Sequence, residues 1–489
     1  MVIDTVRAGD LFDPIAGVLP SGILATDAIS NTSQSFANKV AYSWSDDPLR
    51  FNNQGQKWIA DKRYWQFQMQ TYGGVKNVGT PRGYELPALG IGFQFAPHTI
   101  EFEFLFTGQK LTFEFLNLGG DGTGTGLFSP EIAWGGDCQV MIEYGGRMWY
   151  AAAVPKVTTR TDGSRSYRNL SFTAPYHGRI RFRCSNIGFM RVSTEASAIV
   201  AKAPDRQFIL TDGDSYFESA YALDADNTTG WYSASLTDFI ADMTGFAKGG
   251  RGQGATGFFA NAIGLAMDDT VASVNQSGII SSGPSRFLSA DRRQWMADAV
   301  GHMAAHGRGT FTNYPGEDFG QPVGRRPLMY LLNGTWNDAS VGGVDEPTMY
   351  ARAKNCYQWV HAVDPLCLFV HISPQPFDDH FYGATVGPPR NGDKSDIHRQ
   401  GQMRAVSESP MVRYVNAFGP DSLTRWWSGY GPDPANGSQG TPTDSQQAQL
   451  VSVRDGIHCR MEGYRYYAAK IVDALAEMRI PAVRAYGLD

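Results

Sequence analysis

The first half of the chain alternates apolar and polar residues with a period of two. Residues 100–106 (IEFEFLF) alternate apolar side chains with glutamate, and residues 111–115 (LTFEF) do so again after Thr107-Gly108-Gln109. Because successive side chains of a strand point to opposite faces, each run predicts a strand with one face in a core. The Gly-containing segment between the runs predicts a turn, so the whole stretch predicts a β-hairpin.

A second hairpin is predicted over residues 140–150, where Gly145-Gly146 separates two β-prone runs. The alternation continues at residues 170–172 and 180–182. Several short strands joined by Gly-rich turns are typical of a β-sandwich or jelly roll.

The pattern therefore divides the chain into three parts. Residues 85–204 are expected to form the β-sandwich, jelly-roll-like domain. Residues 1–84 are polar and rich in Asn, Gln and Trp, and we expect an irregular segment that packs on the sandwich or docks a partner. Residues 205–489 form the third part, in which the periodicity changes.

After residue 205, short apolar runs alternate with segments whose apolar residues have helical spacing. Strands are predicted at residues 208–211, 327–332 and 366–370, and helices at residues 236–243, 295–303, 349–360 and 464–478. Strand–helix alternation predicts an α/β domain, with a parallel sheet covered by helices on both sides. Ligands of such sheets bind beyond the carboxyl ends of the strands, and the Gly-, Pro- and Ser-rich residues 383–445 predict long loops over that edge.

Composition narrows the functional classes. The chain has 489 residues, 55 of them Gly, with 12% aromatic and 18% charged residues, which is unlike a disordered chain or a coiled coil. A net charge of −6 argues against nucleic acid as a partner. No apolar run approaches the roughly 18 residues of a membrane span, and the N-terminus lacks the basic and apolar regions of a signal peptide.

The five cysteines are widely spaced and form no CxxC motif, which argues against a disulfide framework and against a zinc ribbon. Buried thiols are the favoured interpretation, and a bridge between Cys138 and Cys184 stays open. His302 and His306 have helical spacing, but no Glu adjoins the first His as a zinc protease requires, so no metal is expected.

Two segments combine a nucleophile with a base. Asp212-Gly213-Asp214-Ser215 follows the first strand of the second half, where Ser215 is exposed at the edge of the sheet if the turn is tight. A serine hydroxyl is a weak nucleophile that needs a neighbouring base. Asp455-Gly-Ile-His458 precedes the last helix and offers an imidazole with a carboxylate to orient it. Each segment alone is equally typical of a turn or a helix cap.

Two further segments offer oxyanion donors. Gly249-Gly-Arg-Gly-Gln-Gly254 follows the candidate second strand, and it lacks the Lys-Ser/Thr ending of a phosphate-binding loop. Gly334-Thr-Trp-Asn337-Asp338 follows the strand at 327–332, where an Asn amide can donate to a developing oxyanion. A flexible Gly loop and an Asn-rich turn are the structural alternatives.

Taken together, the blocks LTDGDS, GRGQGATG, LLNGTWND and RDGIHCRMEGYRYYA resemble the SGNH hydrolases, also called the GDSL esterase family, over roughly residues 205–480. The resemblance implies a flavodoxin-like three-layer domain over residues 205–489. It implies Ser215 as nucleophile, His458 as base and Asp455 as the partner of His458. The implied oxyanion hole consists of the Ser215 backbone N–H, Gly254 and Asn337, and no cofactor is needed.

Gly252 is a second choice for the loop glycine. The sequence departs from the family at two points, the Gly334–Asn337 spacing and Tyr216. Two residues separate Gly334 from Asn337, where the family has one, so Trp336 is an insertion or a wall of the pocket and Asn333 is a weaker substitute for Asn337. Trp336 and Tyr216 are bulky, and they either line the substrate pocket or simply pack.

A β-sandwich ahead of an SGNH domain resembles bacterial and phage carbohydrate esterases. The expected substrate is therefore an acetylated or otherwise acylated polysaccharide or glycan, and the expected enzyme a carbohydrate O-deacetylase. The lack of a signal peptide favours a phage tail or virion-associated enzyme, acting outside the cell, with a homo-oligomer or a virion protein as partner; a cytoplasmic location is the alternative. The competing hypotheses are a lipase or thioesterase for longer acyl chains and a non-catalytic glycan-binding or structural tail protein.

Overall fold

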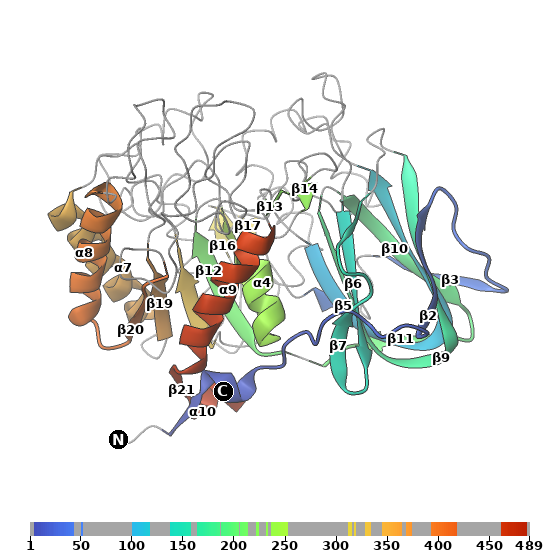
Figure 1. The fold of residues 1–489 in the computed structure, drawn as a ribbon, viewed down its shortest axis with the longest axis horizontal. Helices are drawn as coiled ribbons and strands as arrows, with labels where there is room; N and C mark the ends of the chain where they lie inside the picture. The colour runs from blue at the N-terminus through green and yellow to red at the C-terminus, as the bar shows by residue number, and fades with distance from the viewer. Residues whose placement is uncertain are drawn as a thin grey trace. The chain divides into compact units, whose positions relative to one another are not determined.

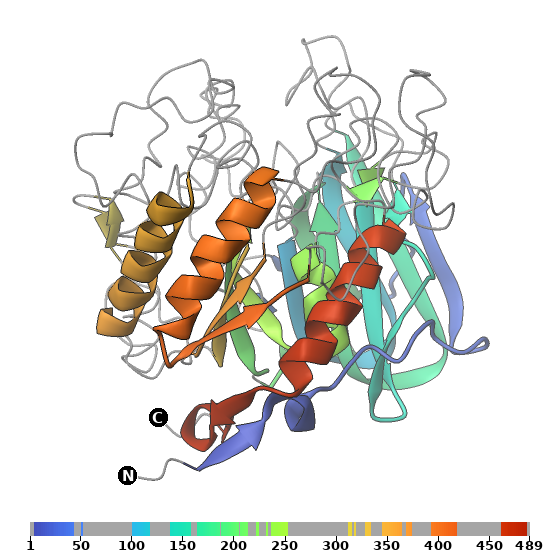
Figure 2. The ribbon, with the colours of Figure 1, turned by 60° about the vertical axis from the view of Figure 1, so that its left-hand side comes forward.

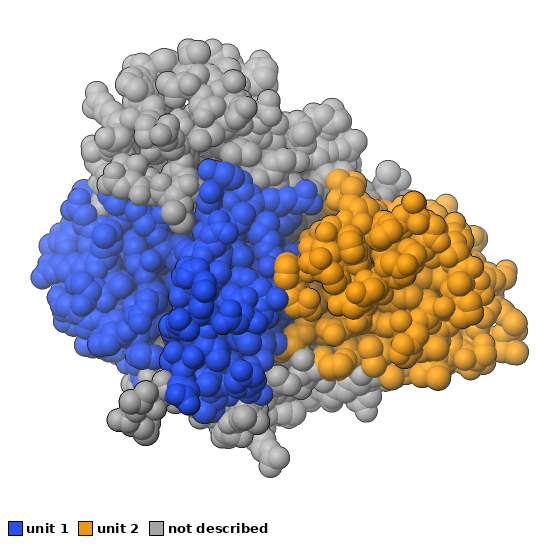
Figure 3. All heavy atoms as spheres, turned by 60° about the horizontal axis from the view of Figure 1, so that its bottom comes forward, with its two compact units in different colours: residues 1–12, 207–489 blue, residues 13–206 orange. Residues whose placement is uncertain are grey.

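The computed structural model describes part of the chain. The chain divides into two compact units. The described residues are 4–43, 50–51, 100–117, 137–157, 164–185, 187–204, 206–213, 222–223, 231–232, 236–252, 312–314, 317–318, 328–333, 345–363, 368–373, 393–417 and 461–486 (Figure 1). Unit 1 comprises Met1–Phe12 and Gln207–Asp489, and unit 2 comprises Asp13–Arg206 (Figure 3). The sequence pattern places the corresponding change after residue 204.

Unit 1 contains a five-stranded sheet in which every described neighbouring pair is parallel (Figure 2). Its strands, in spatial order, are β15 (Ala247–Gly252), β12 (Phe208–Gly213), β18 (Met329–Leu332), β19 (Leu368–Ile372) and β20 (Val412–Val415). Counted along the chain this order is 2-1-3-4-5, which is the order of flavodoxin-like doubly wound sheets. The α/β class predicted from the sequence is thus confirmed for the described strands.

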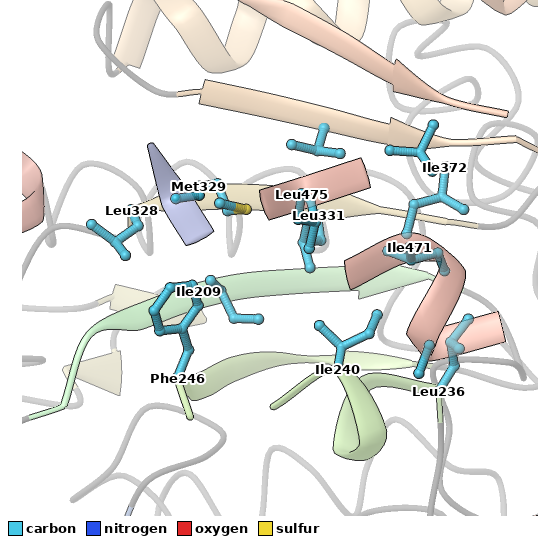
Figure 4. Close-up of a cluster of buried hydrophobic side chains, with 14 of the residues drawn as sticks. Ile209, Leu236, Ile240, Phe246, Leu328, Met329, Leu331, Ile372, Ile471 and Leu475 are labelled. Atoms are coloured by element: carbon cyan, nitrogen blue, oxygen red, sulfur yellow. The ribbon is translucent and has the colours of Figure 1, made fainter. Parts of the chain in front are cut away.

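Within the described residues of unit 1, four helices cover this sheet. Alternate residues of the central strands, such as Leu331 and Val370, join a buried cluster that also includes Leu236 and Ile471 (Figure 4). These two belong to α4 (Leu236–Thr244) and α9 (Met461–Ala476). The other face carries α7 (Glu346–Val363) and α8 (Asp393–Ser407); the Tyr357 ring of α7 packs edge-on against Phe369 at 5.0 Å. The sheet is therefore the middle of three layers.

Short elements complete the described part of unit 1. They are β1 (Thr5–Arg7), η1 (Ala8–Leu11), β13 (Ala222–Leu223), β14 (Trp231–Tyr232), β16 (Thr312–Tyr314), β17 (Glu317–Asp318), β21 (Arg479–Pro481) and α10 (Ala482–Tyr486). β1 pairs with β21 in antiparallel register, so the first residues of the chain lie beside the last. No helix among the described residues is long and apolar enough to cross a membrane.

The prediction of loops over residues 383–445 is wrong for part of that stretch, because α8 and β20 lie in it. The sequence hides α8 because two of its fully buried positions are the polar His398 and Gln402, while the apolar Ile397 and Met403 are exposed. Gly401 lies where an added Cβ would come within 2.8 Å of the Glu346 carbonyl oxygen, so α8 approaches α7 closely. The fully buried residues of α8 include His398, Gln402 and Ala405.

Unit 2 contains one ten-stranded sheet whose described pairs are antiparallel. Its strands are β2 (Leu24–Ser30), β3 (Lys39–Ser43), β4 (Arg50–Phe51), β5 (Ile100–Asn117), β6 (Asp137–Tyr144), β7 (Arg147–Tyr150), β8 (Lys156–Val157), β9 (Arg165–Ser185), β10 (Ile187–Glu195) and β11 (Ile199–Lys202). The central pair is β5 with β9, and a core of Phe side chains includes Phe113 and Phe182, whose rings stack at 4.3 Å. The predicted antiparallel strands are present, and the jelly-roll form stays a prediction.

The hairpin predicted over residues 100–115 is wrong: both runs belong to the single strand β5. The register against β9 shifts between Gly108 and Lys110, which keeps Phe106 and Leu111 on the buried side although their spacing is odd. A Cβ at Gly108 would lie 2.7 Å from the Phe106 ring. Gly108 therefore permits a close approach inside a strand, and the sequence signal for a turn came from that glycine.

The second predicted hairpin is confirmed. β6 and β7 pair up to Tyr144 and Arg147, and the two residues between them, Gly145 and Gly146, have φ of 61° and 75°. Two consecutive positive φ values are the requirement of a tight hairpin turn that suits the strand twist. The described residues of segment 1–84 include β1, which pairs in unit 1, and β2 to β4, which pair in the sheet of unit 2.

Candidate active site

Three neighbouring strands of unit 1 end together at the carboxyl edge of the sheet. Gly213, the last residue of β12, is in register with Gly252, the last residue of β15. Asp212 is in register with Leu332, the last residue of β18. The chain therefore leaves the sheet at almost one level from three adjacent strands.

The first strand of this sheet lies inside it. β12 has β15 on one side and β18 on the other, and α4 follows β12 on one face whereas α7 follows β18 on the opposite face. The chain thus winds in opposite directions from this point. In open α/β sheets the crevice beyond such a switch point is where ligands bind, so the edge between β12 and β18 is the candidate site.

The residues assigned from the sequence lie outside the described residues. These are Ser215, Tyr216, Gly254, Trp336, Asn337, Asp455 and His458. The described elements next to them are the ones expected. Ser215 follows β12 by two residues, Gly254 follows β15 by two, and His458 comes three residues before α9. Of the alternatives, Gly252 is the last residue of β15 and Asn333 directly follows β18.

Polar residues continue along the same edge. Asn333, Ser373 and Asn416 directly follow β18, β19 and β20. Asn333 and Ser373 are fully buried, and the Ser373 amide donates to the Val415 carbonyl at 2.9 Å. Sequence reasoning considered Asn333 and missed the other two. The available signal was the small polar residue directly after each apolar run.

A histidine near the end of β19 is a third residue that the sequence analysis missed. His371 is fully buried, and its Nδ1 forms a hydrogen bond with the Tyr357 hydroxyl. Burial lowers the pKa of His371 to about 3, so the imidazole is neutral near pH 7. Its ring lies edge-on to Tyr414 at 5.8 Å, on the face covered by α7 and α8. These contacts give His371 a structural role in the layer beside the candidate site.

Two further features of the site are its lack of a described metal-binding group and the glycines at two strand ends. Within the part of the chain that the structure describes, no group of three His, Cys, Asp or Glu residues is placed to hold a metal. The strand ends themselves, β12 and β15, finish in glycine, which leaves room for a ligand to approach the backbone.

No protein-family model and no curated protein matches this chain. Solved structures do match. A family two carbohydrate esterase from Clostridium thermocellum, solved with cellohexaose, is 14% identical, with 78% of this chain and 92% of that chain covered and a TM-score of 0.42. A family two carbohydrate esterase from Cellvibrio japonicus is 11% identical, with 89% of this chain and 99% of that chain covered and a TM-score of 0.41. A salicylyl-acyltransferase from a tetracycline biosynthetic pathway is 11% identical, with 88% of this chain and 96% of that chain covered and a TM-score of 0.42.

Each of these comparisons describes a likeness of fold, and what those proteins bind or convert is a property of those proteins.

Proposed function

We propose that the chain is a serine esterase whose active site lies at the carboxyl edge of β15, β12 and β18. The observation that carries the proposal is the matched ending of these three strands, with β12 in the middle. Consecutive Cα atoms are about 3.8 Å apart, so Ser215 stays within about 8 Å of Gly213 whatever path the chain takes. The same bound keeps Gly254 near Gly252. Nucleophile and oxyanion loop are thus tethered to adjacent strand ends.

The proposed reaction is acyl transfer in two steps. His458, oriented by Asp455, takes the proton of Ser215 as its Oγ attacks the ester carbonyl. The Ser215 N–H, the Gly254 N–H and the Asn337 amide donate to the oxyanion of the tetrahedral intermediate. The alcohol leaves with the proton from His458, and water, activated by the same base, then releases the acid. No metal or cofactor takes part in this scheme.

The proposed substrate is a glycan that carries acetyl or other short acyl groups. The low share of charged residues and the modest net charge suit a neutral, hydroxyl-rich substrate better than a polyanion. Tyr216 and Trp336 would stack on a sugar ring or narrow the acyl pocket. A virion-associated enzyme that acts outside the cell is the proposed setting.

Hydrolysis of p-nitrophenyl esters of increasing acyl length tests this function. We expect the highest kcat/KM for acetate, with a steep fall for longer chains, and acetate release from acetylated polysaccharides but not from chemically deacetylated ones. Activity that rises with acyl length would instead identify a lipase or thioesterase. Binding to glycans without any turnover would identify a non-catalytic protein.

Replacing the proposed oxyanion donor is expected to slow the reaction without weakening substrate binding. Asn337→Ala should lower kcat by about 10²- to 10³-fold with little change in KM, because the amide acts on charge that develops in the transition state. Asn333→Ala is the matched variant, measured together with its melting temperature because Asn333 is buried. A larger kcat loss in a folded Asn333→Ala would assign the donor to Asn333 instead.

A further inference from the structure

Two cysteines of unit 2 face each other across neighbouring strands. Cys138 in β6 and Cys184 in β9 are directly opposite in antiparallel register. Both are buried, and both are thiols in the structure. Directly opposite residues of an antiparallel pair point to the same face, with Cα atoms about 4.5–5.5 Å apart. A disulfide requires a Cα separation of about 4.4–6.8 Å, so the strand register places this pair within bonding geometry.

Two cationic side chains lie next to Cys138. Nη1 of Arg168 lies 3.5 Å from the Cys138 sulfur and donates to the Cys138 carbonyl at 2.7 Å. Lys156 is the register partner of Cys138 on its other side, in β8. Within the described residues both cations contact Asp27, which binds Arg168 through two hydrogen bonds of 2.8 Å and lies 3.8 Å from Lys156. The Arg168 guanidinium can therefore stabilise negative charge that develops on the Cys138 sulfur during attack.

The ends of the strands give a small oxidant a route to this pair. Cys138 is the second residue of β6, and Cys184 is the last but one of β9. Strand ends open locally at a lower free-energy cost than strand centres. The thiols are therefore buried in the closed sheet and within reach of a peroxide when the ends open.

We propose that Cys138 and Cys184 are a redox pair that forms a disulfide between β6 and β9. Cys138 gives up its thiol proton, its sulfur attacks one oxygen of hydrogen peroxide, and the O–O bond breaks; the hydroxide that leaves takes up that proton as water, and Cys138 becomes a sulfenic acid. The Cys184 sulfur attacks the Cys138 sulfur, the S–O bond breaks, and the departing hydroxide takes the Cys184 proton as water. Two thiols are oxidised, and one peroxide is reduced to two waters.

The bond would close a loop of about 45 residues and restrict the unfolded chain. For a unit of this size, the typical stabilisation by a disulfide corresponds to a rise in melting temperature of roughly 5–10 °C. Disulfides persist outside the cell and are reduced in the cytosol, so this pair would strengthen unit 2 only after release.

The test treats the folded full-length protein with hydrogen peroxide, blocks the remaining thiols with iodoacetamide and maps the peptides by mass spectrometry. We expect a linked peptide that contains Cys138 and Cys184, lighter by two hydrogen atoms and cleaved by dithiothreitol, together with the rise in melting temperature. Cys184→Ser and Cys138→Ser should lose both signals. Lys156→Gln, which removes one of the two cations, should slow disulfide formation about 2- to 5-fold.

The proposal is overturned if both cysteines of the peroxide-treated folded protein are still alkylated after unfolding, at a peroxide concentration that oxidises them in the unfolded chain. Linkage of either cysteine to Cys356, Cys367 or Cys459, or oxidation to sulfinic acid without a bridge, would also contradict it.

Discussion

Ser215→Ala is expected to abolish ester hydrolysis, with kcat reduced on the order of 10⁴- to 10⁶-fold and KM little changed. The physical reason is that the hydroxyl is the attacking group, so without it only binding and the oxyanion donors remain to accelerate attack by water. The measurement is steady-state hydrolysis of p-nitrophenyl acetate by wild type and variant at equal concentration. The melting temperature of the variant should match that of the wild type.

Two controls make the result specific to this serine. Ser407→Ala removes an exposed hydroxyl on α8 that donates to the Arg404 carbonyl at 2.7 Å, and it should leave kcat unchanged. The double variant Ser215→Ala with His458→Ala should lose no more activity than Ser215→Ala alone, because groups that act as a unit do not add. Turnover that survives in Ser215→Ala would remove Ser215 as the nucleophile and, with it, the proposed mechanism.

The α/β half of the fold could be predicted from sequence because its strands and helices differ in periodicity. The run at 327–332 is apolar at every position of β18, and the stripe at 464–478 marks the one buried face of α9. Helix α8 could not be found this way, since its core contacts are made by His398 and Gln402, whereas its exposed side carries Ile397 and Met403. Burial of polar side chains is decided by neighbours that the local pattern does not contain.

The antiparallel half shows a different limit. The alternation of Phe and Glu correctly predicts strands, yet Gly108 predicts a turn where the chain continues and bulges. A glycine needed for close packing against Phe106 and a glycine needed for positive φ look alike in sequence. Gly145 and Gly146 are the second kind, and there the prediction is confirmed.

The candidate site, too, could be predicted from the sequence only in part. The order of the motifs along the chain predicts which strand each motif follows. The order of the strands in the sheet then places the ends of these strands side by side. Ser373 and Asn416 each follow an apolar run, but only the register of β18, β19 and β20 shows that they share an edge with Asn333, and His371 carries no sequence signal of its own. The neutral state of His371 likewise depends on burial, which lowers its pKa.

Glu101→Gln is expected to destabilise unit 2 by about 3–5 kcal/mol, or roughly 6–20 °C in melting temperature. Glu101 is buried in β5 and accepts from Arg183 at 2.8 Å and from Arg206 at 2.7 Å, and Arg181 lies 3.7 Å away. Glu103 is the other carboxylate of this cluster, 3.3 Å from Arg181 and 3.2 Å from Arg206. Neutralising Glu101 leaves Glu103 as the carboxylate that, among the described contacts, faces the buried Arg181 and Arg206, and it removes a partner of Arg183.

The pH dependence of unfolding separates this charge effect from simple repacking. Burial alone raises the pKa of Glu101, but the charges of Arg183, Arg181 and Arg206 outweigh burial and hold it far below its usual value. A carboxyl with a depressed folded-state pKa stabilises the fold above its unfolded pKa of about 4.3, and this contribution is lost as the pH falls. The difference between wild type and Glu101→Gln should therefore be constant near pH 7 and shrink as the pH drops below about 4.

Glu143→Gln is the matched control in the same unit. Its carboxylate is 31% exposed and lies 3.8 Å from the Arg179 guanidinium, and a partly solvated pair contributes about 1 kcal/mol or less. Gln at this position keeps an oxygen that can accept from the Arg179 amide, which Glu143 now binds at 3.0 Å. Equal losses in the two variants, or a Glu101→Gln deficit that does not change with pH, would mean that the buried arginines do not depend on Glu101 for their charge balance. A larger, acid-sensitive loss in Glu101→Gln alone is the outcome that a desolvated carboxylate among three guanidinium groups requires.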